Sequence, residues 1–178
     1  MQTPRFRPHL LALAVAVLLG SVYLPAQAMT SDQAIALAES AWKQKDATAL
    51  AQLQTAAQSG DANAQDILGF MYYNGRGVPQ DYAQAAYWYR KAADQGDAGA
   101  QYILGFMYLK GLGVPQDYVI AYALFNLSAT GDPSSDNPAT SNRSKLAPRM
   151  TPKQIAAGQE LTRRMMKIGV LKAIDSWR

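Results

Sequence analysis

The sequence contains no cysteine, and its only histidine is His9, close to the N-terminus. Disulfide bonds and thiol nucleophiles are therefore excluded, and the nitrogen and sulfur ligands of the usual zinc sites are almost absent. Glutamate is also scarce, with only Glu39 and Glu160, which lie near opposite ends of the sequence. We therefore expect no catalytic residues, no metal site and no cofactor. The aspartates at repeat boundaries and helix starts are interpreted as helix caps.

The sequence also lacks a long hydrophobic run. The longest is the ten-residue stretch "LLALAVAVLL", which ends at Leu19, whereas spanning a membrane takes about 20 apolar residues. Arg5 and Arg7 precede the run, and Ala26 and Ala28 follow it in an A-x-A-like arrangement. This order predicts a signal peptide over residues 1–28, followed by a periplasmic or secreted mature chain. Retention of the segment as an uncleaved anchor is the alternative.

Charge is nearly balanced after removal of residues 1–28, with 15 Lys and Arg against 13 Asp and Glu. This balance predicts no nucleic-acid partner. The distribution is uneven, however. Residues 143–178 carry nine basic and two acidic residues, whereas residues 29–142 carry six basic and eleven acidic ones. The basic C-terminal region is either a set of solvated helix faces or a surface for an anionic lipid, glycan or acidic protein.

A stretch of sixteen residues occurs almost unchanged twice. "ILGFMYYNGRGVPQDY" (67–82) and "ILGFMYLKGLGVPQDY" (103–118) share thirteen identical positions at a spacing of 36 residues. A fixed period of this length is typical of solenoid proteins, in which stacked units share a core. A weaker copy precedes them. We therefore divide the mature chain into a degenerate repeat (29–60), two full repeats (61–96 and 97–132) and a C-terminal region (133–178).

Each full repeat is predicted to form two helices. In the first, helices are expected from about Ala62 to Tyr73 and from Asp81 to Gln95, because apolar residues recur with helical periodicity. Asp81 and Gln84 fit a capping box. A glycine in the middle of the first helix of both repeats, Gly69 and Gly105, suggests that another helix passes close by. In the C-terminal region, a loop or at most a frayed helix is expected over residues 130–142, then a helix from Pro152 to about Lys167, with a bend near Gly169.

The spaced pattern "LG..Y..G.GV..D" followed by "A..W...AA..G" resembles the Sel-one-like repeat family, a relative of the tetratricopeptide repeats. The resemblance implies an all-α fold, a right-handed α-solenoid of antiparallel helix pairs, closed here by a helical C-terminal cap. It also implies a role in protein–protein contacts. Some relatives with a cysteine pair in every repeat are associated with β-lactam binding or hydrolysis. This activity is not transferred, because the chain has no cysteine.

These observations favour an exported scaffold or adaptor that binds proteins in the cell envelope. Two alternatives remain: an envelope enzyme such as a cell-wall hydrolase, and a fixed structural subunit of an envelope assembly. The enzyme would need an acidic pair lining a cleft, whereas the structural subunit would need permanent contacts.

The partner surface is predicted on the side of the first helix that varies between the two full repeats. The opposite side is the same in both, as packing demands, whereas recognition allows difference. The predicted partner-binding residues are Asp66, Phe70, Tyr73, Tyr102, Phe106, Leu109 and Lys110. Aromatic residues often dominate the energy of an interface. The alternative is that Phe70 and Phe106 are buried against a neighbouring repeat.

Overall fold

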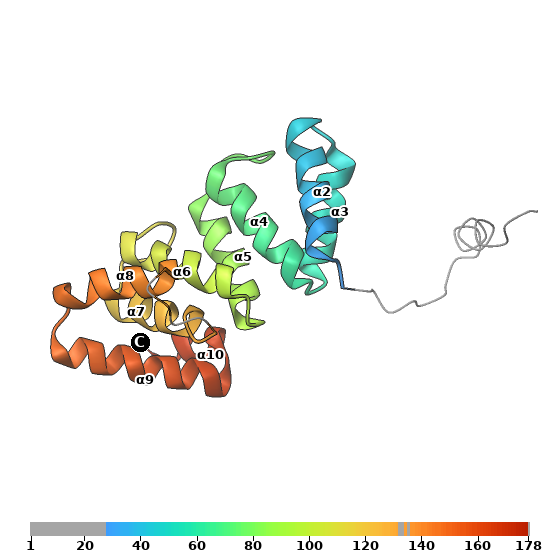
Figure 1. The fold of residues 1–178 in the computed structure, drawn as a ribbon. Coiled ribbons are helices and arrows are strands. Elements are labelled where there is room, and N and C mark those ends of the chain that lie inside the picture. Colours follow the sequence, from blue (N-terminus) through green and yellow to red (C-terminus); the bar gives the residue numbers. More distant parts are fainter. Residues whose placement is uncertain (1–27, 132–133, 135, 178) are drawn as a thin grey trace, which may run out of the picture.

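The computed structural model describes residues 28–131, 134 and 136–177, so nearly all of the predicted signal peptide lies outside the described residues. The described part is helical and contains no strand (Figure 1). Its elements are α2 (Ser31–Lys43), α3 (Ala47–Gln58), α4 (Ala62–Asn74), α5 (Tyr82–Asp94), α6 (Ala98–Lys110), α7 (Tyr118–Ser128), α8 (Pro138–Leu146), the 3₁₀ turn η2 (Ala147–Arg149), α9 (Pro152–Ile168) and α10 (Val170–Asp175). The predicted all-α class is confirmed.

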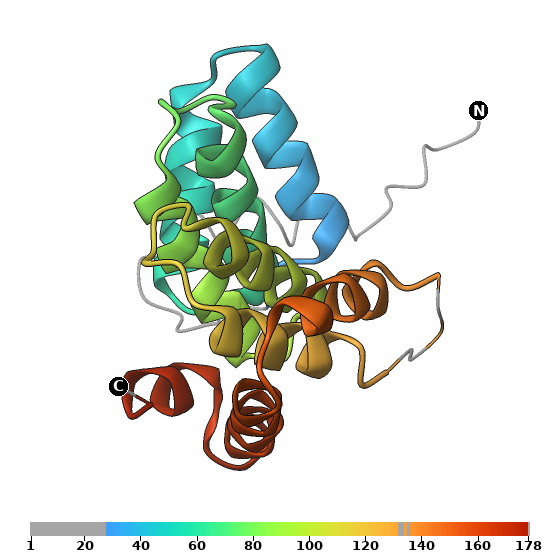
Figure 2. The same cartoon turned by 90° about the vertical axis from the view of Figure 1, so that its left-hand side faces the viewer.

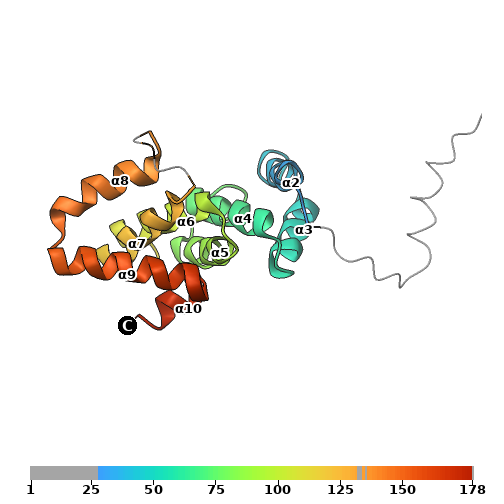
Figure 3. The ribbon, with the colours of Figure 1, turned by 60° about the horizontal axis from the view of Figure 1, so that its bottom comes forward.

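The helices stack as consecutive antiparallel pairs. α2 packs on α3, α4 on α5 and α6 on α7, and each pair packs on the next. Figure 1 shows the pairs following one another from α2 and α3 at one end to α8 and α9 at the other, and Figure 2 shows the same stack from its side. In Figure 3, α2 and α8 lie on one side of the stack, whereas α3 and α10 lie on the other. The predicted right-handed α-solenoid is confirmed.

Aspartates cap the N-termini of five of these helices, α3 to α7. The side chain of Asp61 accepts a hydrogen bond from the backbone N–H of Ala64 at 2.8 Å, and Asp97 accepts one from Ala100 at 2.7 Å. These bonds satisfy N–H groups that have no partner within the helix. Asp81 caps α5 in the same way, but Gln84 does not return the bond, so the predicted capping box is wrong there.

The glycines inside α4 and α6 allow close packing of each helix pair. A Cβ atom on Gly69 would lie 2.9 Å from the ring of Tyr89 on α5, and one on Gly105 would lie 2.9 Å from the ring of Phe125 on α7. Any larger residue would therefore push the paired helices apart. The close approach predicted from the repeated glycine is confirmed in both repeats.

Buried glutamines connect successive repeats. The Gln65 side chain donates a hydrogen bond to the carbonyl oxygen of Ala57 at 3.0 Å, and Gln101 donates one to Ala93 at 3.2 Å. Each bond satisfies a carbonyl at the C-terminal end of the preceding helix, where helices leave acceptors unpaired. Both glutamines are almost fully buried. They fix the position of each repeat on the one before it.

The C-terminal region packs on the last repeat and then turns back. α7 packs on both α8 and α9, which cover it. α8 already begins at Pro138, inside the segment predicted as a loop, because Asn137 caps it through the N–H of Ala139. α9 ends at Gly169 (φ 89°), where the expected bend occurs. α10 then packs on α5, and Asp94 accepts a hydrogen bond from the N–H of Leu171 at 2.9 Å.

Among the described helices, none combines the length and apolar character needed to cross a membrane.

Candidate partner-binding groove

An open groove of about 410 Å³ lies along the first helices of successive repeats. It is lined by Ile35, Ala38 and Trp42 of α2, Asp66, Ile67 and Phe70 of α4, Tyr89 of α5, and Gly99, Tyr102 and Ile103 of α6. Apart from Asp66 and Gly99, all of these residues have apolar or aromatic side chains. We call this surface the α2–α4–α6 groove.

The groove exists because α4 and α6 make little direct contact with each other. Both helices pack on α5, whose buried Tyr89 forms part of the floor between them, and α6 packs more extensively on α7. The rim is exposed: Ile35 has 45% of its surface accessible, although it is a large aliphatic residue. An apolar concavity with an aliphatic rim is a surface that gains free energy when a partner covers it.

An aromatic cluster at one end of the groove holds α2 against α4. The rings of Trp42 and Phe70 lie 6.2 Å apart, and the guanidinium carbon of Arg76 lies 4.9 Å from the Trp42 ring and 5.3 Å from the Phe70 ring. Arg76 belongs to the turn between α4 and α5. A Cβ atom on Gly77 of this turn would lie 3.2 Å from the Cβ of Trp42, so the turn packs closely on the end of α2.

Asp66 is the only carboxylate that lines the groove. Removal from water raises its pKa from 3.8 to about 6, and the negative charge of Asp97 contributes a smaller rise. Among the described residues, no hydrogen bond or ion pair to the Asp66 side chain is found. Burial is also the main cause of the raised pKa of Tyr89, with a further contribution from Asp66. The groove therefore contains a negative charge that the fold does not compensate.

Three of the seven predicted partner-binding residues, Asp66, Phe70 and Tyr102, line this groove. The Tyr102 hydroxyl also accepts a hydrogen bond from the Asn142 side chain at 3.2 Å, so this residue links α6 to α8. The other four lie outside the groove lining. The ring of Tyr73 packs edge-on against Tyr82 at 5.4 Å. Leu109 is half-buried against the core.

Phe106 is half-buried, with the ammonium nitrogen of Lys110 5.7 Å from its ring centre. Phe70 is half-buried as well. Each of the two phenylalanines therefore contributes to packing and keeps an accessible face. They do not share one groove, because only Phe70 is part of its lining.

The sequence analysis missed the contribution of α2. Thr30, Asp61 and Asp97 are the N-caps of α2, α4 and α6. Counting five residues on from each cap gives Ile35, Asp66 and Tyr102, which all line the groove. The row could have been found by aligning Thr30 with the predicted aspartate caps Asp61 and Asp97. The sequences of α2 and α4 are otherwise too different for the repeat pattern to reveal it.

The two glutamates do not form a catalytic pair. Glu39 pairs with Lys43 at 3.0 Å within α2, and Glu160 pairs with Arg163 at 2.6 Å within α9. These helices lie at opposite ends of the stack in Figure 1. In the described part of the chain, no three His, Cys, Asp or Glu residues are grouped so that they could hold a metal ion. A cell-wall hydrolase that depends on paired glutamates therefore gains no support from this arrangement.

Residues 62–97 and 98–133 each match the family model of the Sel1 repeat. The chain contains two Sel1 repeats. Proteins built from this repeat typically mediate protein–protein interactions, and the repeat is typically a non-enzymatic scaffold. A comparison with curated proteins finds no match.

Solved structures of Sel1-like repeat proteins resemble this one. A protective antigen of uropathogenic Escherichia coli strains that displays an SLR fold is 34% identical, with a TM-score of 0.69. The match covers 81% of this chain and 31% of the antigen. A Sel1 repeat protein from Oxalobacter formigenes is 29% identical, with a TM-score of 0.56, and the match covers 67% of this chain and 47% of that protein. The chain thus spans less than half the length of either.

Proposed function

We propose that the protein is an exported scaffold or adaptor of the cell envelope, and that it binds a segment of a partner protein in the α2–α4–α6 groove. The supporting observation is the apolar groove itself, open to solvent and lined by three successive first helices. Solenoid repeats commonly present such concave surfaces to their partners. Exchangeable binding distinguishes this proposal from a fixed structural subunit.

Site-specific photocrosslinking tests the groove as the binding surface. A benzophenone amino acid replaces Ile35 on the groove rim, and the control places it at Gln84, an exposed position of α5 outside the groove. We expect a discrete crosslinked partner from position 35 in cells that make the protein, and none from position 84. A second substitution, Gly99→Tyr, fills the groove and should abolish the crosslink. Equal crosslinking from both positions would refute the proposal.

Export is supported by the sequence pattern of residues 1–28 alone. N-terminal sequencing of the protein recovered from the envelope fraction should begin at Met29 or within a residue or two of it. A membrane-bound protein that still carries Arg5 and Arg7 would contradict cleavage.

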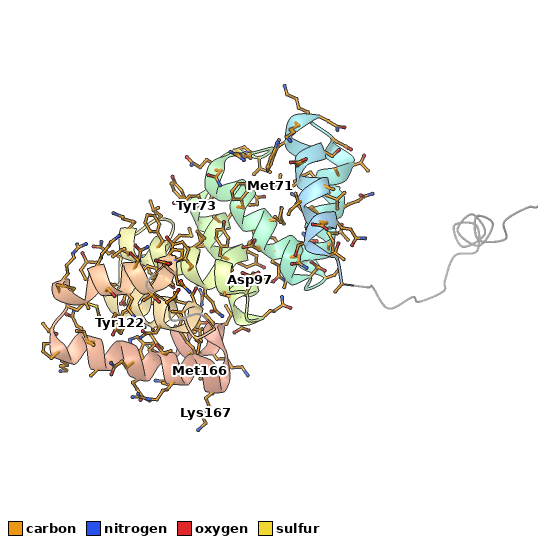
Figure 4. The ribbon with its side chains drawn as sticks, in the orientation of Figure 1. Met71, Tyr73, Asp97, Tyr122, Met166 and Lys167 are labelled. Atoms are coloured by element: carbon orange, nitrogen blue, oxygen red, sulfur yellow. The ribbon has the colours of Figure 1, made fainter. Side chains whose placement is uncertain are left out.

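The basic end of the solenoid is a second candidate surface. Met166 and Ile168 on α9 are 62% and 40% exposed, on either side of Lys167. Figure 4 shows Lys167 extending from α9 away from the rest of the chain. Apolar residues next to basic ones favour contact with an anionic surface. Co-sedimentation with phosphatidylglycerol vesicles should exceed that with neutral vesicles and should fall in Lys167→Glu. Equal sedimentation with both kinds of vesicle would count against this surface.

A further inference from the structure

We propose that the α2–α4–α6 groove recognises a partner segment in which a lysine or arginine adjoins a large apolar side chain, with Asp66 as the binding site for the cation. This inference rests on the proposed function and adds the chemistry of the occupant. The apolar side chain would lie against Phe70, Ile67 and Ile103, and the basic group would reach the carboxylate.

The geometry gives Asp66 no role in the fold. Five other aspartates accept hydrogen bonds from backbone N–H groups at helix starts, Asp61 and Asp97 among them. Asp66 lies in the middle of α4, where no backbone N–H is free to be capped. It is half-buried, lines the groove, and has no partner of opposite charge among the described residues. A partly desolvated carboxylate with no partner is stabilised most by an incoming cation.

The surroundings favour a cation over other ligands. The titratable groups that interact electrostatically with Asp66 are Asp97 at the start of α6 and Tyr89 on α5, so an added negative group would be repelled. α2 contributes Ile35, Ala38 and Trp42, none of which titrates. Arg76, stacked on Trp42 and Phe70, shows that a guanidinium is accommodated beside these aromatic residues. Because the rest of the lining is apolar, a ligand that fills the groove should carry apolar side chains next to its basic group.

The test is a selection of random heptapeptides on the immobilised protein, carried out in parallel on the wild type, Asp66→Asn and Asp66→Lys. We expect wild-type selection to enrich Lys or Arg next to a large apolar residue. Asp66→Asn should lose the basic preference, and Asp66→Lys should replace it with Asp or Glu. Asp66→Asn conserves the size and shape of the side chain, so its result does not depend on whether Asp66→Lys folds.

One selected peptide is then measured against a matched peptide in which norleucine replaces the basic residue. At pH 7.5, the basic peptide should bind the wild type about tenfold or more tightly than the norleucine peptide. The advantage should shrink towards pH 5, because the carboxylate then carries a proton. It should be absent at both pH values in Asp66→Asn.

The outcomes separate this inference from the proposed function. Peptides that bind the wild type but not Gly99→Tyr, and that carry no basic residue, would overturn the cation site and leave the groove intact. Peptides that bind Gly99→Tyr as well as the wild type would overturn both.

Discussion

The Asp66→Asn substitution should make the protein more stable at neutral pH, although it removes the charged group of the proposed binding site. The pKa of Asp66 is raised from 3.8 to about 6, first by burial and then by Asp97. Because the folded state holds this proton more tightly than the unfolded state, the free energy of unfolding falls as pH rises between these two values. Below about pH 3.8 the penalty is absent, and above about pH 6 it is complete. Asparagine has the same shape and no charge, so it removes the penalty.

The magnitude follows from the size of the pKa change. At 1.36 kcal/mol per pKa unit, a rise from 3.8 to about 6 is worth of the order of 3 kcal/mol. For a domain of this length, 1 kcal/mol changes the melting temperature by about 2–4 °C. Asp66→Asn should therefore melt up to about 6–12 °C above the wild type at pH 7.5. At pH 3.5 the difference should reflect only the exchange of a neutral acid for an amide.

Urea unfolding at pH 3.5 and pH 7.5, followed by circular dichroism, measures the effect as a double difference between the two proteins. Changes in other aspartates with pH cancel, because both proteins contain them. Asp32→Asn, which removes an exposed charge from α2, controls for the lost net charge and should show a much smaller double difference. The reasoning would be refuted if the free energy of unfolding changed equally between pH 3.5 and pH 7.5 in the wild type and in Asp66→Asn. The charge of Asp66 would then be compensated within the fold.

Three further predictions concern packing, and each can be measured by urea unfolding. In Gly105→Ala the new Cβ meets Phe125, which should cost about 1–3 kcal/mol of stability, offset in part by up to about 1 kcal/mol of helix propensity. Gly99→Ala should lose much less, because a Cβ in this first turn of α6 meets only the Asp97 carboxylate, at 3.2 Å. Phe125→Ala should lower the free energy of unfolding by about 3–5 kcal/mol, and Phe70→Ala, at a half-buried position, by less than half of that. Equal losses would place Phe70 in the core. Ile174→Ala should cost about 2–5 kcal/mol and the exposed Lys172→Ala under about 0.5 kcal/mol, and similar values would show that α10 does not pack stably on α5.

The sequence was sufficient to predict the helix pairs, because their determinants are local and repeated. Asp61 and Asp97 cap equivalent helices, and Gly69 and Gly105 mark equivalent close contacts. The extent of α8 was not predicted, because its start depends on one Asn cap inside a segment rich in loop-forming residues. A cap of this kind is a single side-chain hydrogen bond, which composition cannot reveal.

The groove was predicted only in part, because its boundaries depend on which helices touch. The position of Asp66 and Phe70 on the variable side of α4 was visible in the sequence. The spacing between α4 and α6 was not, and neither was the role of Trp42. The turn after α4 packs against Trp42, and the corresponding turn of the first unit, between α2 and α3, spans only residues 44–46.

The row of positions five residues after each cap gives an independent reason to assign Asp66 to binding. The buried positions of the first helices are the same in both full copies: Leu68 matches Leu104, and Gly69 matches Gly105. The row position instead holds Ile35, Asp66 and Tyr102 in successive helices, so packing accepts an aliphatic or an aromatic residue there. Either would avoid the cost of desolvating a carboxylate in the groove. A charged residue that the fold does not need, and that lowers its stability, is best explained by a ligand that pairs with it.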